Sequence, residues 1–224
     1  MKFRRNKAEE ADSVEAAPHV AAPGRDAAAV GDAGVENQRA AGPWDVSEVE
    51  LVEGRPDQVD LGSLVLTMHE GLDLQLQVDE RSGQVVAALL AGKEGAVELR
   101  VFAAPRHGDI WDDVRKDIAA EVTRRGGTVT EVVGRWGPEI RVLMQVTTPD
   151  GRSGTQPSRV FGIAGPRWLL RATFFGSPAL EPDDNGPVEL ALRDVIVRRG
   201  TGPHAPGEAL PLTVPAGLTP QTPQ

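Results

Sequence analysis

The stretch from Phe102 to Val129 contains the residues of this chain whose types and spacing most resemble a catalytic centre. His107 lies two residues before Asp109, and a general base commonly lies beside a carboxylate that orients it. No serine or cysteine nucleophile is near them in the sequence, and a loop histidine beside a helix-capping aspartate explains the same residues. We therefore interpret His107 as a loop residue and Asp109 as a helix cap, and we predict no catalytic residue.

A row of carboxylates continues from this point at intervals of four residues. Such spacing places side chains on one face of a helix, where a hard divalent cation could be attracted. Side chains of a single helix rarely converge on one ion, however, and basic residues lie nearby, so a solvated helix face is favoured. With four histidines and no cysteine in the chain, we predict no metal or cofactor site. The row consists of Asp109, Asp113, Asp117 and Glu121.

Three further motifs lack a residue that their chemistry requires. Glu94 follows Gly92-Lys93 where a phosphate-binding loop needs serine or threonine. Ser153 lacks the glycine spacing of a nucleophile elbow, and His69 leads into a strand instead of a helix with a second histidine. We therefore expect that the protein is not an enzyme. A site assembled from residues distant in the sequence stays open as an alternative.

Positive charge is concentrated in the middle of an acidic chain. The net charge is -9, yet twelve lysines and arginines stand against eight acidic residues between Arg100 and Arg171. Arg141, Arg167 and Arg171 lie opposite apolar neighbours in predicted strands, so their side chains should point out from the sheet. Together with an aromatic side chain such as Trp136 or Phe175, these arginines could bind nucleic acid. Outward arginines are common on half-exposed sheets, so nucleic acid is kept as the alternative to a protein partner.

Caps and periodicity predict the helix that carries the histidine and the carboxylates. Asp109 lies where an N-cap belongs, and Gly126-Gly127 supplies a left-handed stop. Four apolar residues between them keep the spacing of one helical face, namely Trp111, Val114, Ile118 and Val122.

Alternation of apolar and polar residues predicts strands before and after this helix, and a more continuously apolar run predicts the strand at 84–90. Ala164-Gly165 is the expected turn of the last hairpin, and Pro187 should open a short second helix. The order of elements predicts an α+β fold, with a single, mainly antiparallel sheet on which one long and one shorter helix pack. The predicted strands are 72–78, 84–90, 97–102, 128–133, 139–146, 159–163 and 166–175; the short helix is 188–193, and 195–197 either extends it or forms a last strand.

Composition divides the chain into a leader (1–43), an acidic linker (44–62), the α+β domain (63–200) and a proline-rich tail (201–224). The leader has too little bulky apolar surface to offset chain entropy, so disorder is expected there. In the tail, Leu210, Leu212 and Val214 alternate and could lie extended on the domain. No apolar run approaches the roughly 20 residues of a membrane span, so a cytoplasmic location without a membrane partner is expected.

The acidic linker combines one large aromatic residue with many carboxylates. Six acidic residues and one arginine lie between Trp44 and Asp60. A free linker gains nothing from an isolated tryptophan, whereas a docking segment gains an apolar anchor, and its carboxylates could face Arg141, Arg167 and Arg171. We hypothesise that this segment folds back on the domain or presents Trp44 to a partner; a solubilising linker is the alternative.

Four stretches carry a resemblance to a known family: GPWDVSEVE, VDLGSL, VFAAPRHGDIWDDVRKDIAAEVTRRGGTV and GPRWLLRATFFG. With the order of segments from about Gly42 to Pro215, they resemble the uncharacterised actinobacterial family known as domain of unknown function 3710. This resemblance implies no activity. The strand–helix–strand order is also similar to the Mog1/PsbP-like fold, whose members are mostly non-enzymatic binding or assembly factors, and this similarity transfers no residues.

The sequence thus favours a non-catalytic protein-binding or assembly module with an unidentified protein partner. Its candidate interaction residues are Trp44, Arg141, Arg167 and Arg171.

Overall fold

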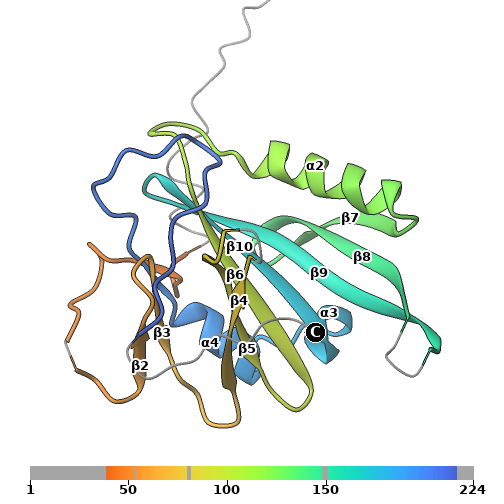
Figure 1. Ribbon diagram of the computed structural model, residues 1–224, viewed down its shortest axis with the longest axis horizontal. Helices are drawn as coiled ribbons and strands as arrows, with labels where there is room; N and C mark the ends of the chain where they lie inside the picture. The colour runs from red at the N-terminus through yellow and green to blue at the C-terminus, as the bar shows by residue number, and fades with distance from the viewer. Residues whose placement is uncertain (1–38, 53, 80–81, 148–150, 216–224) are drawn as a thin grey trace, which may run out of the picture.

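A seven-stranded antiparallel sheet forms the main part of the structure (Figure 1). The computed structural model describes residues 39–52, 54–79, 82–147 and 151–215. The strands of this sheet follow the order β4-β5-β6-β10-β9-β8-β7. Their bounds are Asp73–Val78 (β4), Val85–Ala91 (β5), Gly95–Ala103 (β6), Thr128–Gly134 (β7), Gly137–Thr147 (β8), Ser153–Gly165 (β9) and Trp168–Gly176 (β10).

The two faces of this sheet differ because successive side chains of a strand point in opposite directions. Leu170 lies opposite Val101 and Ile163, and all three are buried. Its neighbour Arg171 lies opposite Arg100 and Gly162 on the other side of the sheet. We call the side with Leu170 the core face and the side with Arg171 the open face.

Helix α2 (Trp111–Arg124) covers part of the open face, where it contacts β7, β8 and β9. Trp111 packs directly on Gly162. The indole lies so close to this glycine that a Cβ atom there would be 2.5 Å from it. Ile118 and Val122 also pack against the core, and Gly126 takes the left-handed conformation with φ 78°. The predicted helix is confirmed, including its apolar face and its glycine stop.

A second, four-stranded sheet contradicts the expectation of a single sheet. Its strands follow the order β1-β11-β3-β2, and β1 runs parallel to β11. They are too short for an alternating pattern to stand out from the sequence, which explains why they were missed. Their bounds are Trp44–Asp45 (β1), Gln58–Asp60 (β2), Leu64–Thr67 (β3) and Ile196–Val197 (β11).

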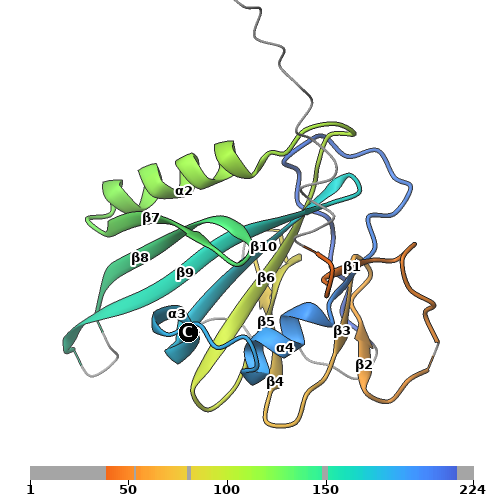
Figure 2. The same cartoon turned by 180° about the vertical axis from the view of Figure 1, so that it is seen from behind.

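Two short helices, α3 (Ser177–Leu180) and α4 (Pro187–Arg193), lie beyond the end of β10. Figure 2 shows α4 in front of the seven-stranded sheet, on the side opposite the open face. Leu192 of α4, Leu64 of β3 and Val197 of β11 join Leu99 and Leu170 in one hydrophobic cluster. The core therefore lies between the core face, α4 and the second sheet.

The turn between β9 and β10 lies two residues later than predicted. Pro166 and Arg167 form it, and Arg167 adopts a positive φ of 62°. Proline at the second position followed by a residue with positive φ is typical of a type II turn, whose third position usually holds glycine. The sequence pattern assigned the turn to Ala164-Gly165, because glycine is the usual residue there.

Both ends of the described chain pack on the domain. Arg39 is 6% exposed, although the predicted leader extended to residue 43; residues 1–38 lie outside the described residues. In the tail, Leu210 and Leu212 are buried, and the Leu210 amide donates a hydrogen bond to the Val101 carbonyl. The tail thus runs beside β6 at residues 208–210, and Leu212 pairs with Gly62 and with Val85 of β5. Leu210 and Leu212 lie on the domain as their alternation suggested, whereas Val214 is 38% exposed.

Candidate functional site

His107 and Asp109 do not form a catalytic pair in this structure. Both are exposed in the loop that precedes α2. The N-cap residue of the helix is Ile110, one position after the predicted cap, but Asp109 Oδ1 still accepts a hydrogen bond from the Trp111 amide at 2.9 Å. Asp109 therefore does satisfy an amide of the first helical turn.

We expect Asp109→Ala to lower the free energy of unfolding by about 1 kcal/mol, because the Trp111 amide would lose its acceptor. His107→Ala is the matched control, and its melting temperature should equal that of the parent chain. Thermal unfolding of both variants tests the prediction. Loss of cellular function in His107→Ala without a change in stability would show that the histidine does more than occupy a loop.

The carboxylates along α2 face solvent or neighbouring basic residues. Glu121 is paired with both Arg124 and Arg125, and Asp113 lies 3.9 Å from Lys116 Nζ. Within the described ranges, no group of three or more histidine, aspartate or glutamate side chains could hold a metal ion.

The three predicted interaction arginines do not share one surface. Arg141 lies opposite Arg159, whose own partner on β10 is Phe174, so Arg141 is on the side of the core face. Arg171 points from the open face, and Arg167 is exposed in the turn between β9 and β10. The single arginine-bearing sheet face of the nucleic-acid alternative is therefore not formed.

The acidic segment packs on the domain, but not through the arginines suggested by the sequence. Trp44 is half-buried, and its amide donates a hydrogen bond to the Val195 carbonyl at 2.9 Å. The side chain of Trp168, which is fully buried, donates from Nε1 to Asp45 Oδ2 at 2.7 Å. Arg39 stacks over the same Trp168 ring at 5.2 Å and makes a two-point ion pair with Glu48.

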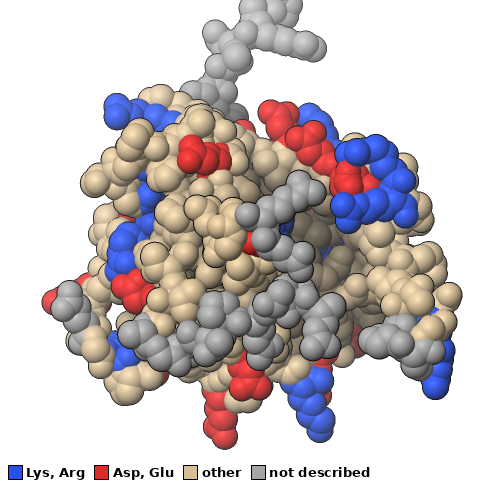
Figure 3. All heavy atoms as spheres, in the orientation of Figure 1, with Lys and Arg blue, Asp and Glu red and all other residues tan. Residues whose placement is uncertain are grey.

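A group of charged and polar side chains occupies the part of the open face that lies beside α2. Arg171 and Arg100 are direct cross-strand neighbours, and Glu98 lies between them. Arg100 Nε donates to Glu98 at 2.8 Å and its Nη2 to Gln77 at 3.3 Å. Arg171 stacks over Phe102 at 5.6 Å. We call these five residues the arginine recess; Figure 3 shows this side hollowed beneath α2, with blue basic atoms inside the hollow.

Arg171 is the least compensated charge of the arginine recess. Its nearest approach to Glu98 is 3.5 Å, because that carboxylate is already held by Arg100. Burial lowers the pKa of Arg171, the neighbouring Arg100 lowers it further, and Glu98 partly opposes both. One fifth of the side chain remains open to solvent. A bound anion would therefore stabilise the charged form of Arg171, which burial and the neighbouring Arg100 disfavour.

A second charged group is buried between β8, β9 and α4. Arg159 forms an ion pair with Glu189 and lies over the ring of Phe174 at 4.7 Å. Glu139 is 1% exposed, and its carboxylate fills the space above Gly134, where a Cβ atom would clash with it. Burial raises the pKa of both glutamates, while Arg159 acts in the opposite direction. The group is nearly closed to solvent, so it serves the fold as a buried ion-pair network.

We expect Glu139→Gln to raise the free energy of unfolding at neutral pH. The pKa of Glu139 lies above its ordinary value of 4.5, so the folded protein holds a proton that the unfolded chain releases, and stability falls as pH rises through the raised pKa. Glutamine removes this dependence. Urea unfolding between about pH 4 and pH 7 should show the gain at neutral pH and none at the acidic end. A constant difference across that range would contradict the assignment.

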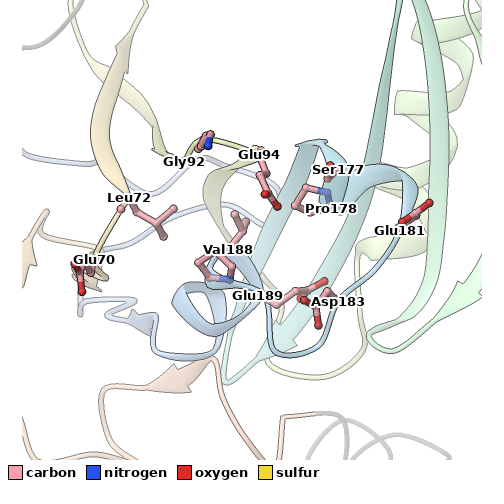
Figure 4. Close-up of a pocket in the computed structure, with 15 residues that line it drawn as sticks. Glu70, Leu72, Gly92, Glu94, Ser177, Pro178, Glu181, Asp183, Val188 and Glu189 are labelled. Carbon is pink, nitrogen blue, oxygen red and sulfur yellow. The ribbon is translucent and has the colours of Figure 1, made fainter.

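An acidic groove with a volume of about 410 Å³ lies between the β5–β6 turn, α3 and the start of α4 (Figure 4). Leu72, Pro178 and Val188 give it apolar walls. Lys93 is its single basic lining residue among five carboxylates, so the groove attracts cations. The carboxylates come from Glu70, Glu94, Glu181, Asp183 and Glu189.

Sequence reasoning missed the buried charges and the groove. Glu139 and Arg159 occupy alternate positions of β8 and β9 that a pattern assigns to solvent, and α4 then covers them. Glu189 follows Pro187 at the start of a helix, where a carboxylate is ordinarily explained by the helix dipole. No local signal in the sequence distinguishes these residues from exposed ones.

The comparison with protein families agrees with the resemblance found in the four stretches. A family model described as "Protein of unknown function (DUF3710)" matches residues 42–221. A crystal structure of a protein from Bacteroides thetaiotaomicron VPI-5482 is similar with a TM-score of 0.34 and 10% identity. That match covers 61% of this chain and 46% of the other, so this chain spans about half of that protein's length.

No curated protein matches the sequence. The described part of the chain has no helix long and apolar enough to cross a membrane. The similarity to the Mog1/PsbP-like fold stays a prediction. Since the family model covers far more than half of the sequence, the chain belongs to the family known as domain of unknown function 3710.

Proposed function

We propose that the protein is a non-catalytic, cytoplasmic binding module that engages a protein partner through the open face of its seven-stranded sheet. The observation that supports this is the half-buried apolar surface around the arginine recess. Leu89 and Thr173 lie opposite Glu98, and Phe175 lies further along β10 on the same face. Apolar and aromatic side chains around an arginine are typical of the centre of a protein interface.

A binding role agrees better than catalysis with the placement of the titratable groups. Glu139 and Glu189 have raised pKa values, which could suit acid catalysis, but they surround Arg159 inside the fold. His107 is exposed in a loop and has no nucleophile near it in the sequence.

Nucleic acid is the less favoured partner. Binding along a phosphate backbone requires several cations on one track, whereas Arg141 and Arg171 point from opposite faces of the sheet. Of the two aromatic side chains that could stack on bases, Trp136 is 2% exposed. Phe175 is half-buried on the open face, where Arg171 is the one predicted arginine that points from the same side.

Site-specific photo-crosslinking in the native host tests the proposal. A photoreactive amino acid at Thr173 samples the open face, and one at the exposed Gln145 samples the opposite side of the same sheet. We expect a distinct protein adduct from Thr173 and none from Gln145, with both variants melting like the parent chain.

Identical adducts from both positions, or none from Thr173, would contradict binding through the open face. Salt-sensitive binding of a single-stranded oligonucleotide that is lost in Arg171→Gln would instead favour the nucleic-acid alternative.

A further inference from the structure

Arg171 lacks a full counter-charge within the described part of the chain. Two arginines of the arginine recess share the carboxylate of Glu98, and Arg100 holds it at the shorter distance, 2.8 Å against 3.5 Å. One positive charge is thus left over in a partly desolvated site, where a carboxylate would interact more strongly than at an open surface.

Among its described residues, the acidic linker has no carboxylate paired with Arg171, although the sequence suggested such a contact. Three of its acidic side chains pair with arginines elsewhere. The pairs are Glu48 with Arg39, Asp57 with Arg55, and Asp60 with Arg198.

Another acidic stretch of the chain has the matching charge. Between Ala8 and Ala17 the sequence AEEADSVEAA contains four carboxylates, one valine and no basic residue, and it directly follows a basic stretch that ends at Lys7. Its charges complement the arginine recess, and Val14 matches the half-buried apolar side chains of Leu89 and Phe175 around it.

We infer that the arginine recess is the docking site of this acidic stretch, Glu9 to Glu15, of the same chain. Roughly 24 residues connect Glu15 to Arg39, where the described structure begins, and they can span about 80 Å. A domain of this size is about 40 Å across, so the stretch reaches the open face from any point of attachment.

Attachment to the same chain favours this occupant over a second copy. A tether of this kind gives an effective concentration on the order of millimolar, so a weak, salt-sensitive contact is sufficient.

Docking of Glu9 to Glu15 would cover the face assigned to the protein partner. The acidic stretch would then compete with the protein partner for the open face. Only this competition rests on the proposed function; the docking itself does not. Removal of the charges of the acidic stretch should therefore increase partner binding.

Paramagnetic labelling measures the docking directly, because the chain contains no cysteine and Ser13→Cys provides a single attachment site that keeps Val14. A nitroxide at this position should broaden the side-chain signals of Leu89 and Thr173, which point from the open face. The side-chain signals of Leu143 and Gln145, which point from the opposite face, should keep their intensity. About 0.5 M salt should remove most of the broadening, since it shortens the range of charge interactions.

Two charge variants with matched controls identify the contacts. E9Q/E10Q/D12N/E15Q and, separately, R171Q should each abolish the broadening. D26N/D32N/E36Q, which alters the other acidic residues of the leader, and R141Q, which alters an arginine of the opposite face, should preserve it.

Absence of broadening in the labelled parent chain would overturn the inference, as would equal broadening on both faces or its persistence in R171Q. Broadening that appears between labelled and isotope-enriched chains in a mixture, and fades on dilution, would assign the contact to a second copy and equally overturn it. A Thr173 adduct without broadening would reject the docking and keep the proposed function. Broadening without any adduct would reject the proposed function and keep the docking.

Discussion

Arg159→Met should lower the free energy of unfolding at pH 7 by about 3–5 kcal/mol, the range observed when one partner of a buried ion pair is removed. Methionine fills much of the same space, but Glu189 and Glu139 would then be buried without the cation that opposes the rise in their pKa values. The loss should shrink as pH falls through the raised pKa values, because protonated glutamates need no counter-charge.

Arg141→Met is the matched control for this experiment. Arg141 lies directly opposite Arg159 on the neighbouring strand, but its side chain is 47% exposed and 3.9 Å from Glu139. Its replacement should change stability by less than about 0.5 kcal/mol. Arg159→Met combined with Glu189→Met should recover much of the loss. Urea unfolding that shows the same large loss at pH 5 and pH 7 would argue against a buried ion-pair network.

Asp45→Ala should lower the free energy of unfolding by about 2–3 kcal/mol. The change removes the acceptor of the Trp168 Nε1 hydrogen bond and leaves this N–H group buried without a partner. It also removes the acceptor of the Ser47 amide and hydroxyl. The Trp44 and Val46 amides, which pair with β11, should then exchange faster with solvent.

The prediction for Asp45 has two informative controls. Trp168→Phe removes the buried donor as well, so adding Asp45→Ala to it should cost less than in the parent chain. Asp57→Ala breaks an exposed ion pair of the same acidic segment and should leave amide exchange at Trp44 unchanged. Equal effects of Asp45→Ala in both backgrounds would show that the Trp168 hydrogen bond contributes little.

The sequence predicted those elements that have a long periodic pattern or strong terminal signals. Helix α2 follows from the spacing of Trp111 to Val122 and from Gly126-Gly127, and the last helix follows from Pro187. Most strands of the seven-stranded sheet follow from alternation, β5 follows from a continuous apolar run, and all seven are at least six residues long. Strands of two to four residues carry no such pattern, and for this reason the second sheet was missed.

The candidate site was less predictable, because it depends on which strands become neighbours. Alternation correctly placed Arg171 on the side of the sheet opposite Leu170, but it could not reveal that Arg141 belongs to the other face. That difference arises from the pairing register of β8 with β9 and of β9 with β10, which nothing in a single strand specifies. Arg167 does not belong to a strand, because the turn between β9 and β10 consists of Pro166 and Arg167 and not of the predicted Ala164-Gly165.

The parallel pairing of β1 with β11 also determines when this protein can complete its fold during synthesis. Trp44 and Asp45 pair with Ile196 and Val197, so about 150 residues separate the partners along the chain. The ribosome must deliver nearly the whole domain before the four-stranded sheet can close. Until then β1 lacks the neighbouring strand β11 that holds Asp45 beside Trp168. The core face of the seven-stranded sheet likewise lacks the complete second sheet that covers it. A chain released before Val197 would therefore expose this surface to chaperones and proteases.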